Sequence, residues 1–414
     1  MKLIFLGGTI MKTMKKIASI ALATIMVMSM MTGCGNEAAV DSSVADSSAA
    51  VESSVADEAT GATFKIGGIG PITGGAAVYG QAVMNAAELA IAEINAAGGV
   101  NGVMFEMNFQ DDEHDAEKSV NAYNVVKDWG AQMILGSVTS APCIAVAQKT
   151  YEDNMFQITP SGTAVDCIQY DNAFRLCFSD PNQGAASAKY IGENGLAEKV
   201  AVIYDSSNAY SSGIYESFAA EAVNYDFEIV AAEAFTEDNN TDFSVQLQKA
   251  KDAEADLVFL PIYCKEAAPL LTQADGMGYA PKFFSCDGMD GILAMEGFDV
   301  ALAEGVMLLT PFAADATDDM TVAFVTAYQE KYGDVPNQFA ADAYDTVYAF
   351  KAAIEKAGVT PDMNISDMCE ALKAAMLEIS IDGLTGNGIT WTADGEPNKE
   401  PKAVIIENGA YKAM

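Results

Sequence analysis

The stretch FKIGGIGPITGGAAVYGQAVMNAAELAIAEINAAGG, residues 64–99, decides the fold class of this chain. Its first seven residues, FKIGGIG, predict a strand. From Gly80 onward, apolar residues recur at a spacing of three or four, which predicts a helix that ends at Gly98 and Gly99. A strand that leads directly into a helix is the first part of an alternating α/β unit.

The same alternation continues toward the C-terminus. It gives the strands VMFEMNFQD and QMILG and the helices AEKSVNAYNVVKDWG and APCIAVAQKTYED, and it restarts at EKVAVIYD. Two successive α/β units with parallel sheets are therefore predicted. Two long helices, at about 318–332 and 339–357, do not continue the second unit, and we expect them to return to the first. Residues 388–412 predict a hairpin with turn signals at Asp394–Gly395 and Asn408–Gly409.

The N-terminal segment predicts export. A basic region, residues 12–16, precedes an uncharged apolar run at residues 17–31. That run is short for a membrane span, which needs about 20 residues, but it suits the apolar core of a signal peptide. We expect residues 1–33 to be a signal peptide, with Met11 or Met14 as the true start.

The sequence MTGC at residues 31–34 resembles a bacterial lipobox, with Cys34 as the lipidated residue. Met31 stands where Leu is usual, and an ordinary secretory signal followed by a chance cysteine is the alternative. Residues 34–62 are rich in Ser, Ala, Val, Asp and Glu and contain no aromatic residue. Such a segment cannot bury a core, and we expect it to be a disordered tether.

The charge balance excludes several partners. The chain has 58 acidic and 22 basic residues and a formal net charge of -36. We therefore expect no binding to nucleic acid and no electrostatic adhesion to anionic lipid, and the charge is interpreted as a solubilising surface.

Cysteine spacing bears on metals and disulfides. Besides Cys34 there are six cysteines, and no two of them form a C-x-x-C pair, so a zinc site is not expected. We expect buried free thiols, with one or two disulfides as the alternative in an exported protein. The six are Cys143, Cys167, Cys177, Cys264, Cys286 and Cys369.

Candidate ligand-binding residues follow the predicted strands, because ligands of open α/β sheets lie beyond the carboxyl ends of the strands. These residues are Tyr79, Ser140 in the loop GSVTSAP, Ser161, Thr163, Tyr210, Tyr263 and Asp287. Hydroxyls and free N–H groups at a helix start suit a carboxylate, and one acid could pair with an ammonium group. Tyrosines offer apolar walls with a polar tip. The set predicts an α-amino acid between two lobes, although each residue alone fits an N-cap, a core tyrosine or a turn.

Catalytic and cofactor chemistry is disfavoured. His114 is the only histidine and lies in DDEHDAE, which we interpret as a solvated helix start and a charged surface loop. Ser-His-Asp and Cys-His machinery thus has one poor candidate. GGIGPITGG fails the dinucleotide pattern because Thr73 replaces the last glycine and Pro71 interrupts the loop. We expect no enzyme activity, catalytic residue, metal or cofactor.

Several segments together resemble the type I periplasmic-binding-protein family, and in particular the leucine/isoleucine/valine-binding receptors of ABC transporters. They are residues 64–102, GSVTSAP, ITPSGT, VAVIYDSSNAYSSG and FAADAYDTVYAF, and the resemblance extends from Phe64 to Lys412. It implies an α/β fold of two doubly wound Rossmann-like lobes joined by a three-crossover hinge. Lobe 1 would comprise 63–179 and 312–384, and lobe 2 would comprise 180–311 and 385–414.

The resemblance also implies roles in lobe 1. Ser140 would bind the ligand carboxylate with help from backbone N–H groups of its loop. Thr163 would contact the ligand through its hydroxyl and Ser161 through its carbonyl, and Tyr79 would lie beside the ligand side chain.

In lobe 2, Asp287 falls where the family has a Glu for the ligand ammonium, and this shorter acid is a departure from the pattern. Tyr210 and Tyr263 would close the cleft.

The expected function is that of a monomeric, lipid-anchored extracytoplasmic substrate-binding protein. It would capture a branched-chain-type or related amino acid by hinge closure and deliver it to an ABC permease. The alternatives are a module for urea, short amides or a sensor system, and an exported amidohydrolase.

Overall fold

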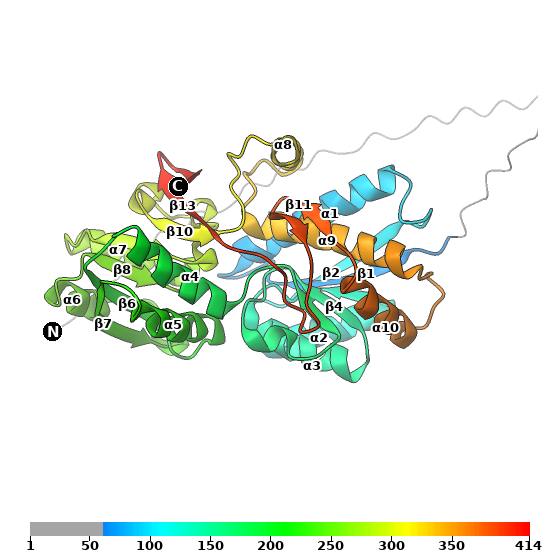
Figure 1. Cartoon of the computed structure of the whole chain (residues 1–414), viewed down its shortest axis with the longest axis horizontal. Coiled ribbons are helices and arrows are strands. Elements are labelled where there is room, and N and C mark those ends of the chain that lie inside the picture. The colour runs from blue at the N-terminus through cyan, green and yellow to red at the C-terminus, as the bar shows by residue number, and fades with distance from the viewer. Residues whose placement is uncertain (1–60) are drawn as a thin grey trace, which may run out of the picture. The chain divides into compact units, whose positions relative to one another are not determined.

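A computed structural model describes residues 61–414 (Figure 1). The predicted signal peptide, Cys34 and nearly all of the predicted tether lie outside these residues. Within the described part of the chain, no helix is both long and apolar enough to cross a membrane.

The first sheet has five parallel strands in the order β2-β1-β3-β4-β5. They are β1 (Phe64–Gly70), β2 (Phe105–Asp111), β3 (Met133–Leu135), β4 (Phe156–Thr159) and β5 (Ala173–Arg175). Because β2 and β3 lie on opposite sides of β1, the winding reverses there, and a crevice at the carboxyl ends of the strands is expected at that point.

The second sheet repeats this order and extends it. Its parallel part runs β7-β6-β8-β9-β10, and β13 and then β14 join β10 in antiparallel pairing. The strands are β6 (Lys199–Asp205), β7 (Glu228–Phe235), β8 (Leu257–Leu260), β9 (Lys282–Ser285), β10 (Met307–Thr310), β13 (Lys402–Glu407) and β14 (Ala410–Ala413). The prediction of two doubly wound parallel sheets is confirmed, and so is the hairpin at Asn408–Gly409.

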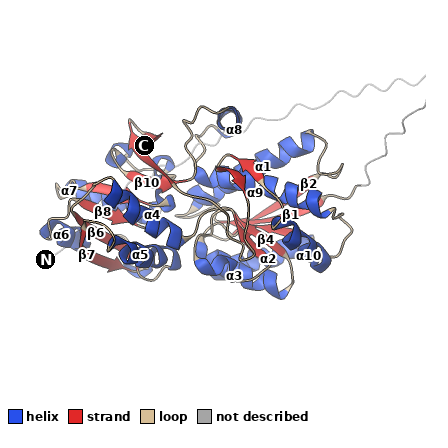
Figure 2. Ribbon diagram, in the orientation of Figure 1, coloured by secondary structure: helices blue, strands red, loops and turns tan. Residues whose placement is uncertain are grey.

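Helices flank both sheets (Figure 2). Beside the first sheet lie α1 (Ala77–Ala96), α2 (Ala116–Trp129) and α3 (Ser140–Glu152), and α4 (Asp180–Glu193), α5 (Ala209–Ala222), α6 (Ser244–Asp252) and α7 (Cys264–Gly276) accompany the second. The long helices α8 (Asp319–Tyr332) and α9 (Gln338–Ala357) pack against α1, and α10 (Ile365–Met376) packs against α9 and β4. As expected, the chain therefore returns to the first sheet after β10.

The close contact between α1 and the loop before it explains why residue 80 is a glycine. A Cβ on Gly80 would lie 1.9 Å from the carbonyl oxygen of Pro71, so no side chain fits there. At its other end α1 stops where Gly98 and Gly99 adopt positive φ angles of 103° and 76°, which L side chains disfavour.

Several elements differ from the sequence prediction. The strand β5, the helices α4 and α10 and the small hairpin β11 (Ile381–Gly383) with β12 (Gly386–Ile389) were not predicted. Helix α5 begins at Ala209, so Tyr210 lies in the first turn of a helix and not in a loop.

Candidate functional site

Two loops at the carboxyl ends of β3 and β4 form one wall of the candidate site. The Ser140 hydroxyl, at the start of α3, accepts a hydrogen bond from the N–H of Ala164 at 3.2 Å and lies 3.5 Å from the Thr163 hydroxyl. The Ser161 hydroxyl donates to the carbonyl of Val138 at 2.8 Å. All three predicted residues are buried, and the two loops are tied together.

Arg175, at the end of β5, holds the second of these loops in place. Its side chain has no exposed surface and donates to the carbonyls of Gly162 at 3.1 Å, of Ala164 at 3.0 Å and of Thr163. Because the guanidinium donates hydrogen bonds to these three carbonyl oxygens, it fixes the backbone beside the Thr163 hydroxyl.

Tyrosines from both lobes meet opposite this wall. Tyr210 stacks on Tyr263 with ring centroids 4.5 Å apart, and Tyr79 lies 5.6 Å from Tyr263. The Tyr79 hydroxyl, on α1, donates to the carbonyl of Gly288 at 2.6 Å and accepts from the N–H of Cys264 at 2.8 Å. Tyr79 therefore links the first lobe directly to two segments of the second.

Asp287 is buried in this tyrosine cluster. Its carboxylate accepts from the Tyr210 hydroxyl at 2.7 Å, and its exposed fraction is 3%. Burial raises the pKa of Asp287 to about 7, against the opposing effect of the bond from Tyr210. The structure thus brings Asp287 to the place where the sequence analysis expected an ammonium partner.

Sequence reasoning missed a second acid, Asp180. This residue begins α4, is 1% exposed, and neither of its carboxylate oxygens has a hydrogen-bond partner within residues 61–414. Burial raises its pKa well above the usual range, and the charge of Asp287 adds to the rise. The Thr163 side chain opposes this effect, although it forms no hydrogen bond of acceptable geometry with the carboxylate.

Asp180 could have been found from the strand-end rule. It follows β5, but AFR is a three-residue strand with no periodicity, and so no strand was predicted there. Gln183, one turn further along α4, accepts from the N–H of Asp287 at 3.1 Å and was also missed.

Tyr263, which directly precedes α7, lies between the two walls. Burial and the charges of Asp180 and Asp287 raise the pKa of Tyr263 well above the usual value. A hydrogen bond from the Ser140 N–H opposes this rise. The hydroxyl of a second-lobe residue thus faces the start of α3, where a ligand carboxylate was expected.

The interpretation of DDEHDAE as a solvated helix start is confirmed for Glu113, Asp115 and Glu117, which are exposed at the start of α2, but it is wrong for the His114 ring. Its Nδ1 lies 2.8 Å from the Thr139 hydroxyl, and its ring is edge-on to Tyr263 at 5.4 Å. Burial lowers the pKa of His114 to about 4, with help from Lys265, so the ring is neutral at pH 7. The neighbouring Asp112 is fully buried, and its carboxylate accepts a bond from the Ser137 hydroxyl.

A cavity of about 550 Å³ opens beside Tyr263, and its walls come from both lobes. Of the seven predicted residues only Tyr263 lines it, whereas the other six form the packed region described above. Its charged and polar lining includes Glu113, His114, Asp205, Lys265 and Glu266.

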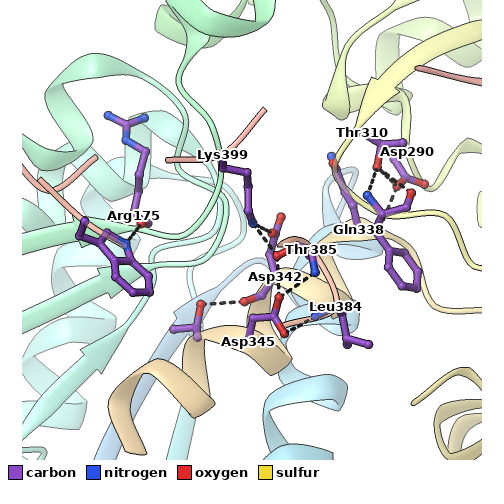
Figure 3. A network of polar contacts seen from close by, with 12 residues as sticks. Arg175, Asp290, Thr310, Gln338, Asp342, Asp345, Leu384, Thr385 and Lys399 are labelled. Carbon is purple, nitrogen blue, oxygen red and sulfur yellow. Dashed lines mark hydrogen bonds and ion pairs between the residues drawn. The ribbon is translucent and has the colours of Figure 1, made fainter. Parts of the chain in front are cut away.

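Three segments connect the lobes, after β5, after β10 and after β12. Polar groups of α9 contact the segment after β12 and the hairpin before it (Figure 3). The ammonium of Lys399 lies 2.9 Å from Asp342 and 2.6 Å from the Thr385 hydroxyl. Asp345 accepts from the N–H groups of Leu384 and Thr385, both at 2.9 Å.

Two further bonds fasten the other connections. Asp290, after β9, accepts from the N–H of Gln338 at 2.9 Å, and the Trp391 indole donates to the carbonyl of Arg175 at 2.7 Å. Buried polar contacts therefore join the connecting segments to each other and to the start of α9.

Comparison with known proteins identifies the family. Residues 63–409 match the model of the family described as periplasmic binding protein. The Leu/Ile/Val-binding protein homolog 3 of Brucella melitensis is 30% identical over 73% of this chain and 81% of its own length. The leucine-, isoleucine-, valine-, threonine- and alanine-binding protein of Pseudomonas aeruginosa is 30% identical over 76% of this chain and 83% of its own.

Solved structures agree with these sequence matches. The substrate-binding protein LivJ of Streptococcus pneumoniae, in complex with isoleucine, has a TM-score of 0.76 at 29% identity and covers 85% of this chain and 98% of its own. The leucine-binding protein LivK of Thermotoga maritima has a TM-score of 0.75 at 26% identity, with the same coverage. The chain therefore belongs to the periplasmic binding protein family.

Proposed function

We propose that this chain is the extracytoplasmic substrate-binding protein of an ABC transporter and that it captures an α-amino acid between its two lobes. The observation that supports this most strongly is a pair of buried carboxylates, Asp180 and Asp287, which form no ion pair within the described residues. An isolated buried charge is costly, and such groups persist at sites where a ligand supplies the opposite charge.

The opposite wall suits the carboxylate of such a ligand. The start of α3 provides free N–H groups and the Ser140 hydroxyl, and the Thr163 hydroxyl lies beside it. Helix N-termini bind anions through these groups and the helix dipole. A zwitterion would thus lie with its carboxylate at α3 and its ammonium at the two acids.

Binding requires Tyr263 to move. Its hydroxyl faces the Ser140 N–H that the ligand carboxylate would take, and its ring fills the space between Tyr79 and Tyr210. We infer that the lobes open, Tyr263 turns toward the 550 Å³ cavity, and the lobes then close on the ligand. The connecting segments around Lys399 would serve as the hinge.

The proposed partners follow from this role. A membrane permease would receive the ligand, and Cys34 would anchor the chain to the outer face of the cell membrane. We further propose a monomer whose lobes divide at 179/180 and 311/312, as the sequence predicts. The third division follows β12, and not residue 384, because β12 pairs with β11. A single lipid chain at Cys34 binds membranes only weakly, so the anchor requires the multiple acylation that lipoboxes direct.

A ligand panel tests the amino-acid proposal. At least one amino acid of the Leu, Ile, Val, Ala and Thr set is expected to raise the melting temperature, because a ligand at 100 times its Kd adds about 2.7 kcal/mol. The panel should include urea, short amides and asparagine, with product release followed for the last. A response to amides alone, or hydrolysis, would replace the proposal with one of those functions.

Replacing Asp287 with Asn tests the ammonium site. The variant keeps the shape but loses a charge, so the Kd for the best amino acid should rise by a factor of about 30 or more. The matched ligand is the same molecule without its amino group, which has nothing to offer Asp287. Its binding should not weaken in the variant. Equal losses for both ligands would show that Asp287 only supports the fold.

A further inference from the structure

Two of the buried cysteines lie together behind the candidate site. Cys143 is in the first turn of α3, and Cys167 is in the short helix Val165–Ile168 that packs on it. Both side chains have no exposed surface and share a small hydrophobic cluster with Ala164. The two side chains therefore pack in one buried cluster, and the Cys167 thiol lies 3.6 Å from the carbonyl oxygen of Ser140, in the same first turn as Cys143.

The chain makes room for these thiols at Gly162. A Cβ at that position would lie 2.9 Å from the Cys143 sulfur, which is closer than real side chains approach. Cys143 is also held from the other side, since the Gln157 amide donates to its sulfur at 3.7 Å. The position of the pair is therefore fixed by its surroundings.

The surroundings make Cys143 the more acidic thiol. Burial raises the pKa of both thiols, but for Cys143 the bonds from Cys167 and Thr159 and the charge of Arg175 outweigh burial, so its pKa is lowered. The pKa of Cys167 stays well above the usual value because of burial and the neighbouring Cys143.

The other four cysteines of the described residues lack such a neighbour. Cys264 donates to the carbonyl of Gly288 and Cys286 pairs with Ser187. No second thiol is among the groups that act on any of these four. The contact between Cys143 and Cys167 is thus specific within residues 61–414.

We propose that Cys143 and Cys167 form a disulfide that ties the Ser140 loop to the Thr163 loop in an oxidising compartment. The oxidant is a small disulfide such as oxidised glutathione. As the chain folds and before the pair is buried, the Cys143 thiolate attacks one of its sulfurs and releases a thiol, and Cys167 then displaces the second thiol from the mixed disulfide. One disulfide and two protein thiols become one protein disulfide and two free thiols. This proposal goes beyond amino-acid binding and does not depend on which ligand the protein takes.

Refolding in a redox buffer tests the pairing. The reduced full-length chain is refolded in oxidised and reduced glutathione, free thiols are alkylated, and linked peptides are identified by mass spectrometry. The Cys143–Cys167 peptide is expected to exceed every other cysteine pairing by at least about tenfold. Free thiols at both positions, a stable glutathione adduct at Cys143 alone, or random pairing would each overturn the proposal.

A stability measurement adds a second readout. Closing a loop of this length should raise the melting temperature of the oxidised protein by roughly 5 °C over the reduced one. Cys177→Ala is the matched control, since Cys177 is buried near Arg175 but has no thiol partner, and it should keep the full shift. Cys167→Ser should lose it. An oxidised protein no more stable than the reduced one would contradict a disulfide at this place.

Discussion

Replacing Asp180 with Asn is expected to raise the melting temperature of the ligand-free protein and to remove most of its response to amino acids. Asp180 is 1% exposed, and its two oxygens are unpartnered. Asn is neutral without a proton, whereas burial makes Asp180 hold one above the usual carboxyl pKa, so the variant should gain about 1–3 kcal/mol of stability at neutral pH. The same change removes one of the two acids that can ionise opposite the ligand ammonium, and the Kd should rise by a factor of about 30 or more.

The pH dependence of stability gives an independent check on Asp180. Its pKa is raised in the folded state, so the native protein binds more protons than the unfolded chain once the pH exceeds the usual carboxyl value of 3.8. Stability therefore falls as the pH rises through this window, and Asn at position 180 should make the fall less steep. A less stable ligand-free variant with normal amino-acid affinity would show that Asp180 serves only the fold.

Lys399→Met is expected to cause the largest loss of stability. The lysine is 5% exposed and supplies the positive charge between Asp342 and Asp345, both of which are buried. Removing one partner of a buried ion pair leaves an uncompensated charge and costs about 3–5 kcal/mol. The loss should be smaller at pH 5 than at pH 8, because burial already raises the pKa of Asp342 to about 6 and a protonated acid needs no partner.

Two variants control this measurement by urea unfolding. Lys118→Met breaks an exposed pair with Glu113, 2.6 Å long, and should leave the free energy of unfolding unchanged. The double variant Lys399→Met with Asp342→Leu replaces both charges by apolar groups and should recover part of the loss. If the double variant recovers no stability, and if the loss in Lys399→Met is the same at pH 5 and pH 8, Lys399 acts by packing alone.

Local patterns explain which parts of the fold could be predicted. The strand Phe64–Gly70 and most helices beside the two sheets could be predicted from apolar spacing and glycine stops, whereas α4 could not. Helix α10 was overlooked although the side chain of Asn364 caps it by accepting from the N–H of Asp367, a start signal present in the sequence.

The residues of the candidate site also fall into those that the sequence could predict and those that it could not. Tyr79, Tyr210 and Asp287 could be chosen because they follow strands that are readable from sequence, and the structure brings them within hydrogen-bond networks of one another. Asp180 follows a strand of three residues, and His114 lies in a segment so acidic that it resembled solvent-exposed surface. Burial of single residues such as Asp112 and Asp180 depends on contacts between distant parts of the chain, which one sequence does not display.

The return of the chain to the first sheet has a consequence for the order of folding. Helix α9 packs against α1, although more than half of the described chain separates the two helices in sequence. Strand β13, which pairs with β10, follows α8, α9 and the connecting segments in the sequence. Neither half can finish its core until the last quarter of the polypeptide is available. Such distant pairings slow folding, because long loops must close before their contacts form. The complete core can therefore form only when synthesis nears its end.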